Sequence, residues 1–335
     1  MDPGDAALDP LDLAYLAAEA CIALASLLGN ALVVWAVKLN QALRDTTFYL
    51  IVSLAVADIA VGAVAIPVAM LISLGVRMPF HACLLGCCLL CVLTQCSILS
   101  LLAIAVDRYL RVRTPVRYRS MMDTRCACLA VAVCWVLPTI LGLLPMLGWN
   151  NRANLKDLDQ PNGTASGSMV CSFPLVMSME YVIYFNFFGL IFSPLVLMTG
   201  LYILVFTTIR RQLSHSQVAC KANRKYYQKE MKLASSLALV LLLFAICWIP
   251  LPIINSVSFF CPHCQVPKAV LYLGILMSHA NSAVNPIVYT FKIRKFRLTV
   301  LKIWRHYFVR RNSLDSSLPQ SCTLHSLGAE KSDSV

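Results

Sequence analysis

Residues 80–110, FHACLLGCCLLCVLTQCSILSLLAIAVDRYL, contain no Asp, Glu, Lys or Arg before Asp107 and Arg108. A helix needs about 20 apolar residues to cross about 30 Å of hydrocarbon, so this run is long enough to cross a bilayer. Lipid offers no hydrogen-bond partner to peptide groups, and such runs are therefore expected to be helical. Six more are present: Leu13–Val37, Phe48–Leu74, Cys126–Leu147, Met179–Ile209, Met231–Phe260 and Ala269–Phe291. The pattern predicts an all-α, integral membrane bundle of seven helices over residues 13–291.

The composition agrees with a single membrane domain, because 59% of residues are hydrophobic, only 13% are charged, and the mean hydropathy is +0.72. The net charge of +12 is distributed unevenly. If residues 1–12 are extracellular, the outer loops hold four basic residues, and the other 24 of 28 Lys and Arg lie inside or at the inner border. This asymmetry predicts a multi-pass plasma-membrane protein with its C-terminus in the cytoplasm. It argues against nucleic-acid binding, since every basic cluster adjoins an apolar span.

Two segments follow the last span. Residues 292–308 alternate basic residues with apolar ones, which predicts a short eighth helix on the inner membrane surface. Its apolar side chains are Ile293, Phe296, Leu301, Trp304 and Phe308. Residues 309–335 are rich in Ser and poor in large apolar residues, so a disordered cytoplasmic tail is expected. Serines in this tail are candidate kinase targets, with ordinary disorder as the alternative.

Four of the fifteen cysteines lie at or beyond the predicted outer ends of the spans. Because the extracellular side is oxidising, we expect disulfides between Cys83 and Cys171 and between Cys261 and Cys264. Zinc binding is the alternative for Cys261 and Cys264, although no second ligand pair is evident. Asn162 begins an Asn-Gly-Thr sequon in the second outer loop, which predicts a glycosylation site.

Few ionisable side chains lie inside the spans or at their borders, among them Glu19, Asp58, Asp107, Arg108, Glu230 and His279. A charged residue at the bilayer centre costs about 2.5–3.5 kcal/mol on insertion scales, so each is a candidate functional residue. The alternative role for each is a packed polar bridge between helices.

Short motifs occur in order, one or more for each span. They are Gly29-Asn30, the segment LAVAD ending at Asp58, Asp107-Arg108-Tyr109, Trp135, Pro194, Cys247-Trp248-Ile249-Pro250 and Asn285-Pro286-Ile287-Val288-Tyr289. With these motifs the chain resembles a class A (rhodopsin-like) G-protein-coupled receptor from about Leu13 to Phe308. The resemblance implies a signalling receptor, not an enzyme.

The resemblance also implies residues for activation. Arg108 is expected to pair with Asp107 and Glu230, and release of Glu230 would let the sixth span swing outward. Pro250 and Pro286 are expected to kink their helices. The other coupling residues implied are Tyr109, Val116, Tyr202 and Tyr289. Asp58, Ser97, Asn281 and Asn285 resemble the family's sodium pocket, with a water-bridged Asp58–Asn285 pair as the alternative; no other cofactor is implied.

Within this class, five stretches resemble adenosine receptors: residues 40–45 (NQALRD), 51–58 (IVSLAVAD), 101–112 (LLAIAVDRYLRV), 147–150 (LGWN) and 278–282 (SHANS). This resemblance implies a purine-nucleoside site. Phe173 is expected to stack on adenine and Asn255 to bond it through both amide atoms. Ser278, His279 and Thr94 are expected to bind the ribose, with Glu19 orienting His279. The apolar walls would be Leu90, Met179, Trp248, Leu251 and Ile275.

Other ligand classes fit less well. Leu90 stands eighteen residues before Arg108, where amine receptors carry an Asp, and no Lys lies in Ala269–Phe291 for a retinal Schiff base. Pro174 and Pro252 resemble the third (A-three) adenosine subtype, whereas Gln95 and the segment Phe260–Cys264 resemble the first (A-one). Both subtypes imply coupling to Gi/o and inhibition of adenylate cyclase. The alternatives are a class A receptor for another neutral small molecule and, from a different class, a polytopic transporter.

Overall fold

The computed structural model describes residues 9–40, 46–121, 123–153, 168–215, 221–261 and 263–305, and nearly all of them are helical. The predicted seven-helix bundle is confirmed. Its spans are α1 (Pro10–Leu39), α2 (Thr46–Ala60) continued by η2 (Val61–Ala65) and α3 (Ile66–Ser73), α4 (Phe80–Arg113), α6 (Thr124–Gly142) followed by η3 (Leu144–Leu147), η4 (Tyr181–Phe192) with α9 (Ser193–His215), α10 (Lys221–Trp248) with α11 (Pro250–Phe260), and α12 (Lys268–Lys292). Three shorter helices are α5 (Pro115–Met121), α8 (Phe173–Val176) and α13 (Arg294–Trp304).

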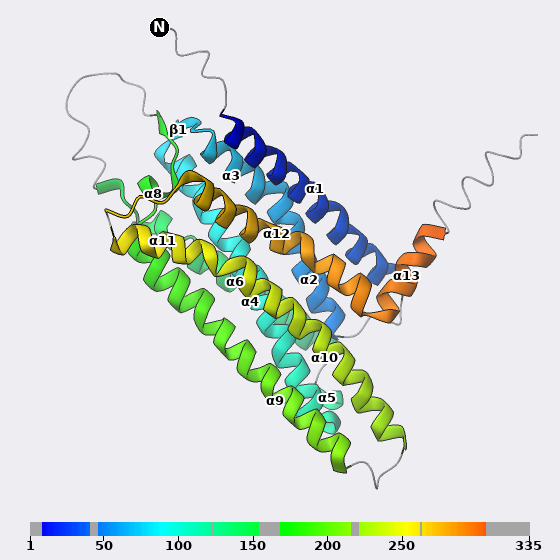
Figure 1. Cartoon of the computed structure of the whole chain (residues 1–335). Helices are drawn as coiled ribbons and strands as arrows, with labels where there is room; N and C mark the ends of the chain where they lie inside the picture. Colours follow the sequence, from blue (N-terminus) through cyan, green and yellow to red (C-terminus); the bar gives the residue numbers. More distant parts are fainter. Residues whose placement is uncertain are drawn as a thin grey trace, which may run out of the picture.

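Six of the seven spans are long and apolar enough, among the described residues, to cross a membrane by length and composition. The seventh, α12, is more polar because its inner face carries buried Ser278, His279, Asn281, Ser282 and Asn285. It packs against α1 on one side and α10 on the other, as Figure 1 shows. Its polar groups therefore face protein, which makes a polar helix compatible with a membrane setting.

Apolar side chains cover the outside of the bundle as well as its core. On α6, Leu129 is 66% exposed and Ile140 is 58% exposed, whereas Asp58 and Arg108 are buried. A soluble protein shows the opposite arrangement of charged and apolar groups. The distribution fits lipid contact on the outside and polar contacts between helices within.

Two prolines predicted to kink their helices behave differently. The sixth span is interrupted at Ile249, between α10, which ends at Trp248, and α11, which begins at Pro250. Pro286 instead lies inside the continuous helix α12. Gly29 of α1 faces Pro286, and a Cβ at Gly29 would lie 3.0 Å from Pro286 Cγ. The glycine thus allows α1 to approach α12 closely.

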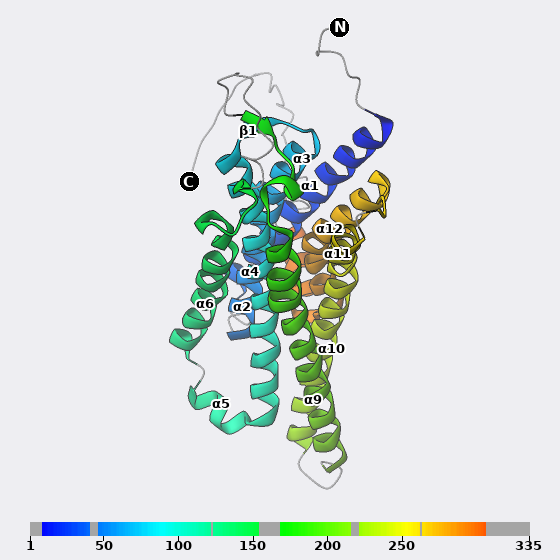
Figure 2. The same cartoon turned by 90° about the vertical axis from the view of Figure 1, so that its left-hand side faces the viewer.

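One end of the bundle, called the outer end here after the predicted orientation, is covered by a short antiparallel pair of strands, β1 (Arg77–Pro79) and β2 (Ser168–Val170), with Arg77 opposite Val170. The opposite end is called the inner end. Figure 2 places β1 at the end opposite α5. Both predicted disulfides are present: Cys83–Cys171, with Cα atoms 5.6 Å apart, and Cys261–Cys264, at 5.3 Å. The first attaches the segment after β2 to the outer end of α4. The sequon at Asn162 lies outside the described residues.

The predicted eighth helix, residues 292–308, corresponds to α13 (Arg294–Trp304), and residues 306–308 of that prediction lie outside the described residues. Its apolar side chains divide into two groups. Phe296 and Ile303 are buried against the bundle, whereas Leu301 and Trp304 are 47% and 57% exposed. The helix therefore uses one apolar face to pack on the bundle and leaves other apolar side chains outside. Figure 1 shows α13 turning away from the end of α12.

Candidate functional site

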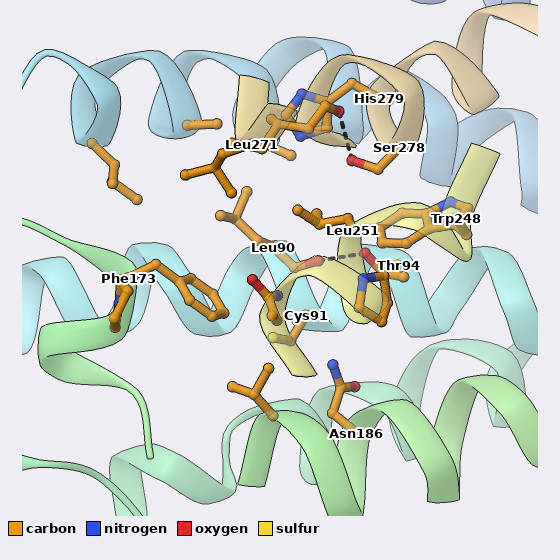
Figure 3. Close-up of a pocket in the computed structure, with 18 of the residues that line it drawn as sticks. Leu90, Cys91, Thr94, Phe173, Asn186, Trp248, Leu251, Leu271, Ser278 and His279 are labelled. Atoms are coloured by element: carbon orange, nitrogen blue, oxygen red, sulfur yellow. Dashed lines mark hydrogen bonds between the residues drawn. The ribbon is translucent and has the colours of Figure 1, made fainter. Parts of the chain in front are cut away.

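A cavity of about 380 Å³ lies in the outer half of the bundle. It is enclosed by α4, η4, α11 and α12, with α8 at its outer end and η2 and α3 along one side. Nine of the predicted ligand-site residues line it: Leu90, Thr94, Phe173, Trp248, Leu251, Asn255, Ile275, Ser278 and His279. Figure 3 shows Phe173 and Trp248 at opposite ends of this space. A largely apolar cavity with a few polar groups is typical of a small-molecule site.

Phe173 reaches the cavity because the chain before it is fixed. Cys171 is bonded to Cys83, and its N–H donates to the Val76 carbonyl oxygen at 3.1 Å. Phe173 then begins α8, with Ser172 as an extended N-cap residue. The second outer loop thereby supplies an aromatic face to a cavity that is otherwise walled mainly by helices.

Asn255 lies on α11 and lines the cavity, and its amide has no hydrogen-bond partner among the described residues. A side-chain amide offers both an N–H donor and a carbonyl acceptor. Neighbouring Ser256 and Ser258 differ in this respect, since their hydroxyls donate to the carbonyl oxygens of Pro252 and Ile254. Asn255 is thus available to a ligand both as a hydrogen-bond donor and as an acceptor.

His279 and Glu19 form a buried pair at the α12 side of the cavity. His279 Nδ1 lies 2.9 Å from both carboxylate oxygens of Glu19, whose side chain is wholly buried. Glu19 does not line the cavity but stands behind the imidazole. A carboxylate on one ring nitrogen fixes the ring orientation and leaves the other nitrogen to face a ligand.

The two hydroxyls at the site are oriented by their own helices. Thr94 Oγ1 donates to the Leu90 carbonyl oxygen at 2.8 Å, and Ser278 Oγ donates to the Ile275 carbonyl oxygen at 2.7 Å (Figure 3). With the hydroxyl hydrogens committed to backbone, each oxygen presents its lone pairs and is suited to accept a bond from a ligand.

Met179 is not where the sequence predicted it. It precedes η4 and is absent from the cavity wall, where Val182 and Ile183 take its place. The sequence prediction also missed Asn186, whose Oδ1 accepts from Gln95 Nε2 at 2.7 Å. Asn186 is the one amide in the apolar run 181–192, so the search for polar groups within spans could have found it. Lys268 and Tyr272, also missed, line the outer end of the cavity.

Below the cavity, Asp58 is wholly buried. Its Oδ2 accepts from Asn285 Nδ2 at 2.8 Å, while Asp58 Oδ1 and Ser97 Oγ have no partner among the described residues. The predicted companion Asn281 is also buried on the inner face of α12. Buried oxygens without donors fit a hard monovalent cation, which would satisfy both of them. The donor set therefore suits the sodium ion suggested by the sequence.

At the inner end, Asp107, Arg108 and Glu230 form a buried network, called here the inner charge network. Arg108 lies 2.5 Å from Asp107 Oδ2 and 3.1 Å from Glu230 Oε2, so it joins α4 to α10. Thr47 donates to Asp107 at 2.6 Å and accepts from Arg108. The sequence prediction had not included Thr47, which lies on the first turn of α2.

Tyr118 of α5 completes the surroundings of Asp107, to which its hydroxyl donates at 2.5 Å. Burial, aided by the Asp107 charge, raises the pKa of Tyr118 to about 12, so the phenol stays protonated and keeps donating. This contact ties the second inner loop to the inner charge network. Val116, two residues earlier, is 87% exposed.

The remaining predicted coupling residues lie near the network. Tyr202 and Tyr289 are buried in the main core, and Tyr109 packs half-buried against the cluster around Val205 and Ile209. The Tyr289 hydroxyl has no partner among the described residues. An unsatisfied buried hydroxyl is one that gains a bond if the helices rearrange.

A family model described as "7 transmembrane receptor (rhodopsin family)" matches residues 29–289. Three relatives carry the name adenosine receptor A3. The chain is 48% identical to that of Canis lupus familiaris over 91% of this chain and 96% of the relative. It is 46% identical to that of Bos taurus over 96% of this chain and 99% of the relative. It is 50% identical to that of Ovis aries over 86% of this chain and 89% of the relative. The chain therefore belongs to the adenosine receptors of the rhodopsin family of seven-transmembrane receptors and resembles their A3 subtype.

Proposed function

We propose that this receptor is activated by extracellular adenosine and couples to Gi/o proteins, which inhibit adenylate cyclase. The observation that carries the proposal is the free Asn255 amide, because it faces the same cavity as Phe173 and His279. Membership of the adenosine receptors supports the choice of ligand, and the A3 names of the three relatives support the coupling class.

In the proposed complex, adenine stacks on Phe173 while the Asn255 amide donates to a ring nitrogen and accepts from the exocyclic amine. Offset aromatic stacking and a two-point amide bond are complementary, since one fixes the plane of the base and the other its edge. Leu90, Leu251 and Ile275 contact the base and sugar on their apolar sides.

The ribose is proposed to lie between α12 and α4. Ser278 and His279 bind its hydroxyls on one side, and Thr94 binds its other end. Glu19 holds the imidazole in position, so the Glu19–His279 pair orients the group that recognises the sugar. Trp248 borders the deep end of the cavity, where its ring stacks on Phe244 with centroids 6.1 Å apart.

Signalling is proposed to use the break in the sixth span. The ligand contacts Trp248 and Leu251 on either side of Ile249 and Pro250, where the helix is interrupted. A shift there alters the direction of α10 and separates Glu230 from Arg108. Because a ligand can move this equilibrium only by its differential affinity, adenosine must bind the opened form more tightly.

A cation at Asp58 would supply positive charge to the buried carboxylate and its oxygen neighbours. Asp58 accepts a bond from Asn285 of α12, so this carboxylate links α2 to α12 below the cavity. The orientation is proposed to place α5 and α13 in the cytoplasm. Exposed Val116 would then insert its side chain into the G protein. Tail serines, outside the described residues, are proposed kinase and arrestin sites.

The test is Asn255→Ala, measured by binding of a labelled adenosine analogue to membranes and by cyclic-AMP suppression. Loss of a two-point hydrogen bond is expected to weaken binding by about 100-fold. Ser258→Ala is the matched control, because Ser258 is exposed on the same helix and bonds only its own backbone. Undiminished affinity in Asn255→Ala would remove Asn255 from the site and with it the principal support for the ligand.

A further inference from the structure

The outer end of the cavity carries one positively charged lining residue among those described, Lys268, on the first turn of α12. Its side chain is 50% exposed, so the cavity meets the outside at this residue. Ser278 lies ten residues further along α12, which corresponds to about 15 Å of helix. Lys268 therefore lies far from the proposed ribose position and close to the entrance.

Lys268 is held by the first turn of α1. Its Nζ lies 2.5 Å from Asp12 Oδ1, and the Tyr272 hydroxyl donates to the same oxygen at 2.7 Å. The Lys268 ammonium also lies 5.4 Å from the centre of the Tyr272 ring. Asp12 itself does not line the cavity, although both of its partners do. One carboxylate outside the cavity thus holds two side chains at its entrance.

A second contact strengthens the same link between α1 and α12. The rings of Tyr15 and Tyr272 are stacked, with centroids 4.0 Å apart and planes within 15°. The Tyr15 hydroxyl also accepts a bond from Ser73 of α3 at 3.4 Å. Asp12, Tyr15 and Glu19 follow one face of α1 at spacings of three and four residues, and each contacts α12. This face of α1 is therefore joined to α12 from the entrance down to His279.

We infer, on the basis of the nucleoside site proposed above, that Asp12 is a positioning residue whose contacts with Lys268 and Tyr272 form a latch over the cavity entrance. The latch slows the escape of bound nucleoside. Without Asp12, Lys268 is free to extend into water and the Tyr272 hydroxyl loses its acceptor. The first turn of α12 can then separate from α1, which opens the entrance without changing the groups that bind adenine or ribose.

The expected effect falls on the dissociation rate, since changes around one binding site act mostly on dissociation and less on association. In Asp12→Asn and Lys268→Met, the dissociation rate of a labelled adenosine analogue is expected to rise about three- to fivefold, as for loss of a partly exposed ion pair. The association rate is expected to change by less than about twofold. Maximal nucleotide exchange at saturating adenosine is expected to stay unchanged.

Two further variants separate the latch from a general structural role. Exchanging the charges in the double variant Asp12→Lys with Lys268→Asp is expected to restore much of the slow dissociation. Asp9→Asn is the matched control, because Asp9 lies one turn earlier and caps α1 by accepting from Leu11 N–H. This control is expected to dissociate ligand at the rate of the unchanged receptor.

A measurement without nucleoside tests the latch independently of the proposed function. Cys91 lines the cavity and is only 5% exposed, so its labelling by a small water-soluble thiol reagent is expected to be slow and to depend on passage through the entrance. Its labelling rate, read by peptide mass spectrometry in the ligand-free receptor, is expected to rise in Asp12→Asn and not in Asp9→Asn. If the receptor bound no nucleoside but this difference remained, the function would fail and the latch would stand. Equal labelling and unchanged dissociation in Asp12→Asn would overturn the latch.

Discussion

The two ends of the bundle both bury a carboxylate paired with a nitrogen-bearing side chain, and the outer pair borders the ligand cavity. At the outer end, Glu19 satisfies His279 from behind, and the imidazole still faces about 380 Å³ of space. At the inner end, Arg108 is enclosed by Asp107, Glu230 and Thr47 and is 1% exposed. The outer pair is thus prepared to receive a ligand, whereas the inner charge network is satisfied within the protein and must be broken to bind anything.

This difference predicts opposite consequences of mutation at the two ends. A change at the outer end should alter how tightly adenosine binds and leave the maximal response intact. A change at the inner end should alter the response, or its resting level, and leave the binding contacts intact. Removing one partner of a buried ion pair leaves an uncompensated charge, so the inner effects are expected to be large.

The largest expected effect is that of Arg108→Ala. It leaves Asp107 and Glu230 buried without their shared cation, and adenosine-stimulated nucleotide exchange on a purified Gi protein is expected to fall by about 100-fold or more. Binding of a labelled antagonist is expected to persist in membranes. Arg113→Ala is the control, because Arg113 is exposed at the end of the same helix. Equal exchange in both variants would contradict the role of the inner charge network.

Glu19→Gln tests the outer pair. Loss of a charged hydrogen bond to His279 is expected to weaken adenosine binding by about 10- to 100-fold, since such bonds contribute about 1.5–3 kcal/mol. The maximal exchange rate at saturating adenosine is expected to remain. Concentration–response curves measure both quantities. Glu180→Gln serves as control because Glu180 is exposed and outside the cavity. A lowered maximal exchange rate with unchanged adenosine affinity would contradict the assignment of the Glu19–His279 pair to ligand binding.

Glu230→Gln should break the inner charge network from the opposite side. Arg108 keeps Asp107 and loses the charged contact at 3.1 Å, so the opened form becomes more populated. Nucleotide exchange without adenosine is expected to rise about threefold. This corresponds to a free-energy shift of roughly half of 1.4 kcal/mol, because 1.4 kcal/mol corresponds to a factor of ten. Lys229→Met provides the control, because Lys229 is exposed and adjacent to Glu230. A basal rate equal to that of the unchanged receptor would show that the Arg108–Glu230 contact does not restrain α10.

The smallest expected effect is that of Tyr118→Phe. It removes one bond to Asp107 but retains the ring that Arg111 covers at 4.8 Å. Basal exchange is expected to rise less than about twofold, because the other contacts of Asp107 remain. Tyr49→Phe, an exposed tyrosine on α2, is the matched control. A large rise in Tyr118→Phe would mean that α5, and not α10, carries most of the inner restraint.

The comparison also explains which parts of the structure were predictable from the sequence. Charged and amide groups are costly within a membrane, so Glu19, Asp58, Arg108 and His279 could be recognised among apolar residues. Their partners were implied by the resemblance to class A and adenosine receptors. Both disulfides could likewise be predicted, since few cysteines lie at the outer end. The polar groups at both ends were therefore recognisable in the sequence, and the resemblance supplied how they pair.

Apolar positions were less predictable because lipid-facing, packed and cavity-lining residues have the same chemistry. Met179 was expected in the wall from the resemblance to adenosine receptors, but it precedes η4, and Val182 and Ile183 of η4 line the cavity instead. On α13, Leu301 and Phe296 are both apolar, and only packing shows that Phe296 is the buried one.

The central claim is that adenosine in the outer cavity opens the inner charge network. The direct measurement is the distance between spin labels at Arg113→Cys on α4 and Lys229→Cys on α10, two exposed inner positions. It requires a background in which exposed thiols, among them Cys21 and Cys128, are replaced. Saturating adenosine with Gi present is expected to shift the distribution to longer distances, and Asn255→Ala should abolish the shift at the same adenosine concentration. A distribution that stays unchanged when adenosine is bound would contradict the account.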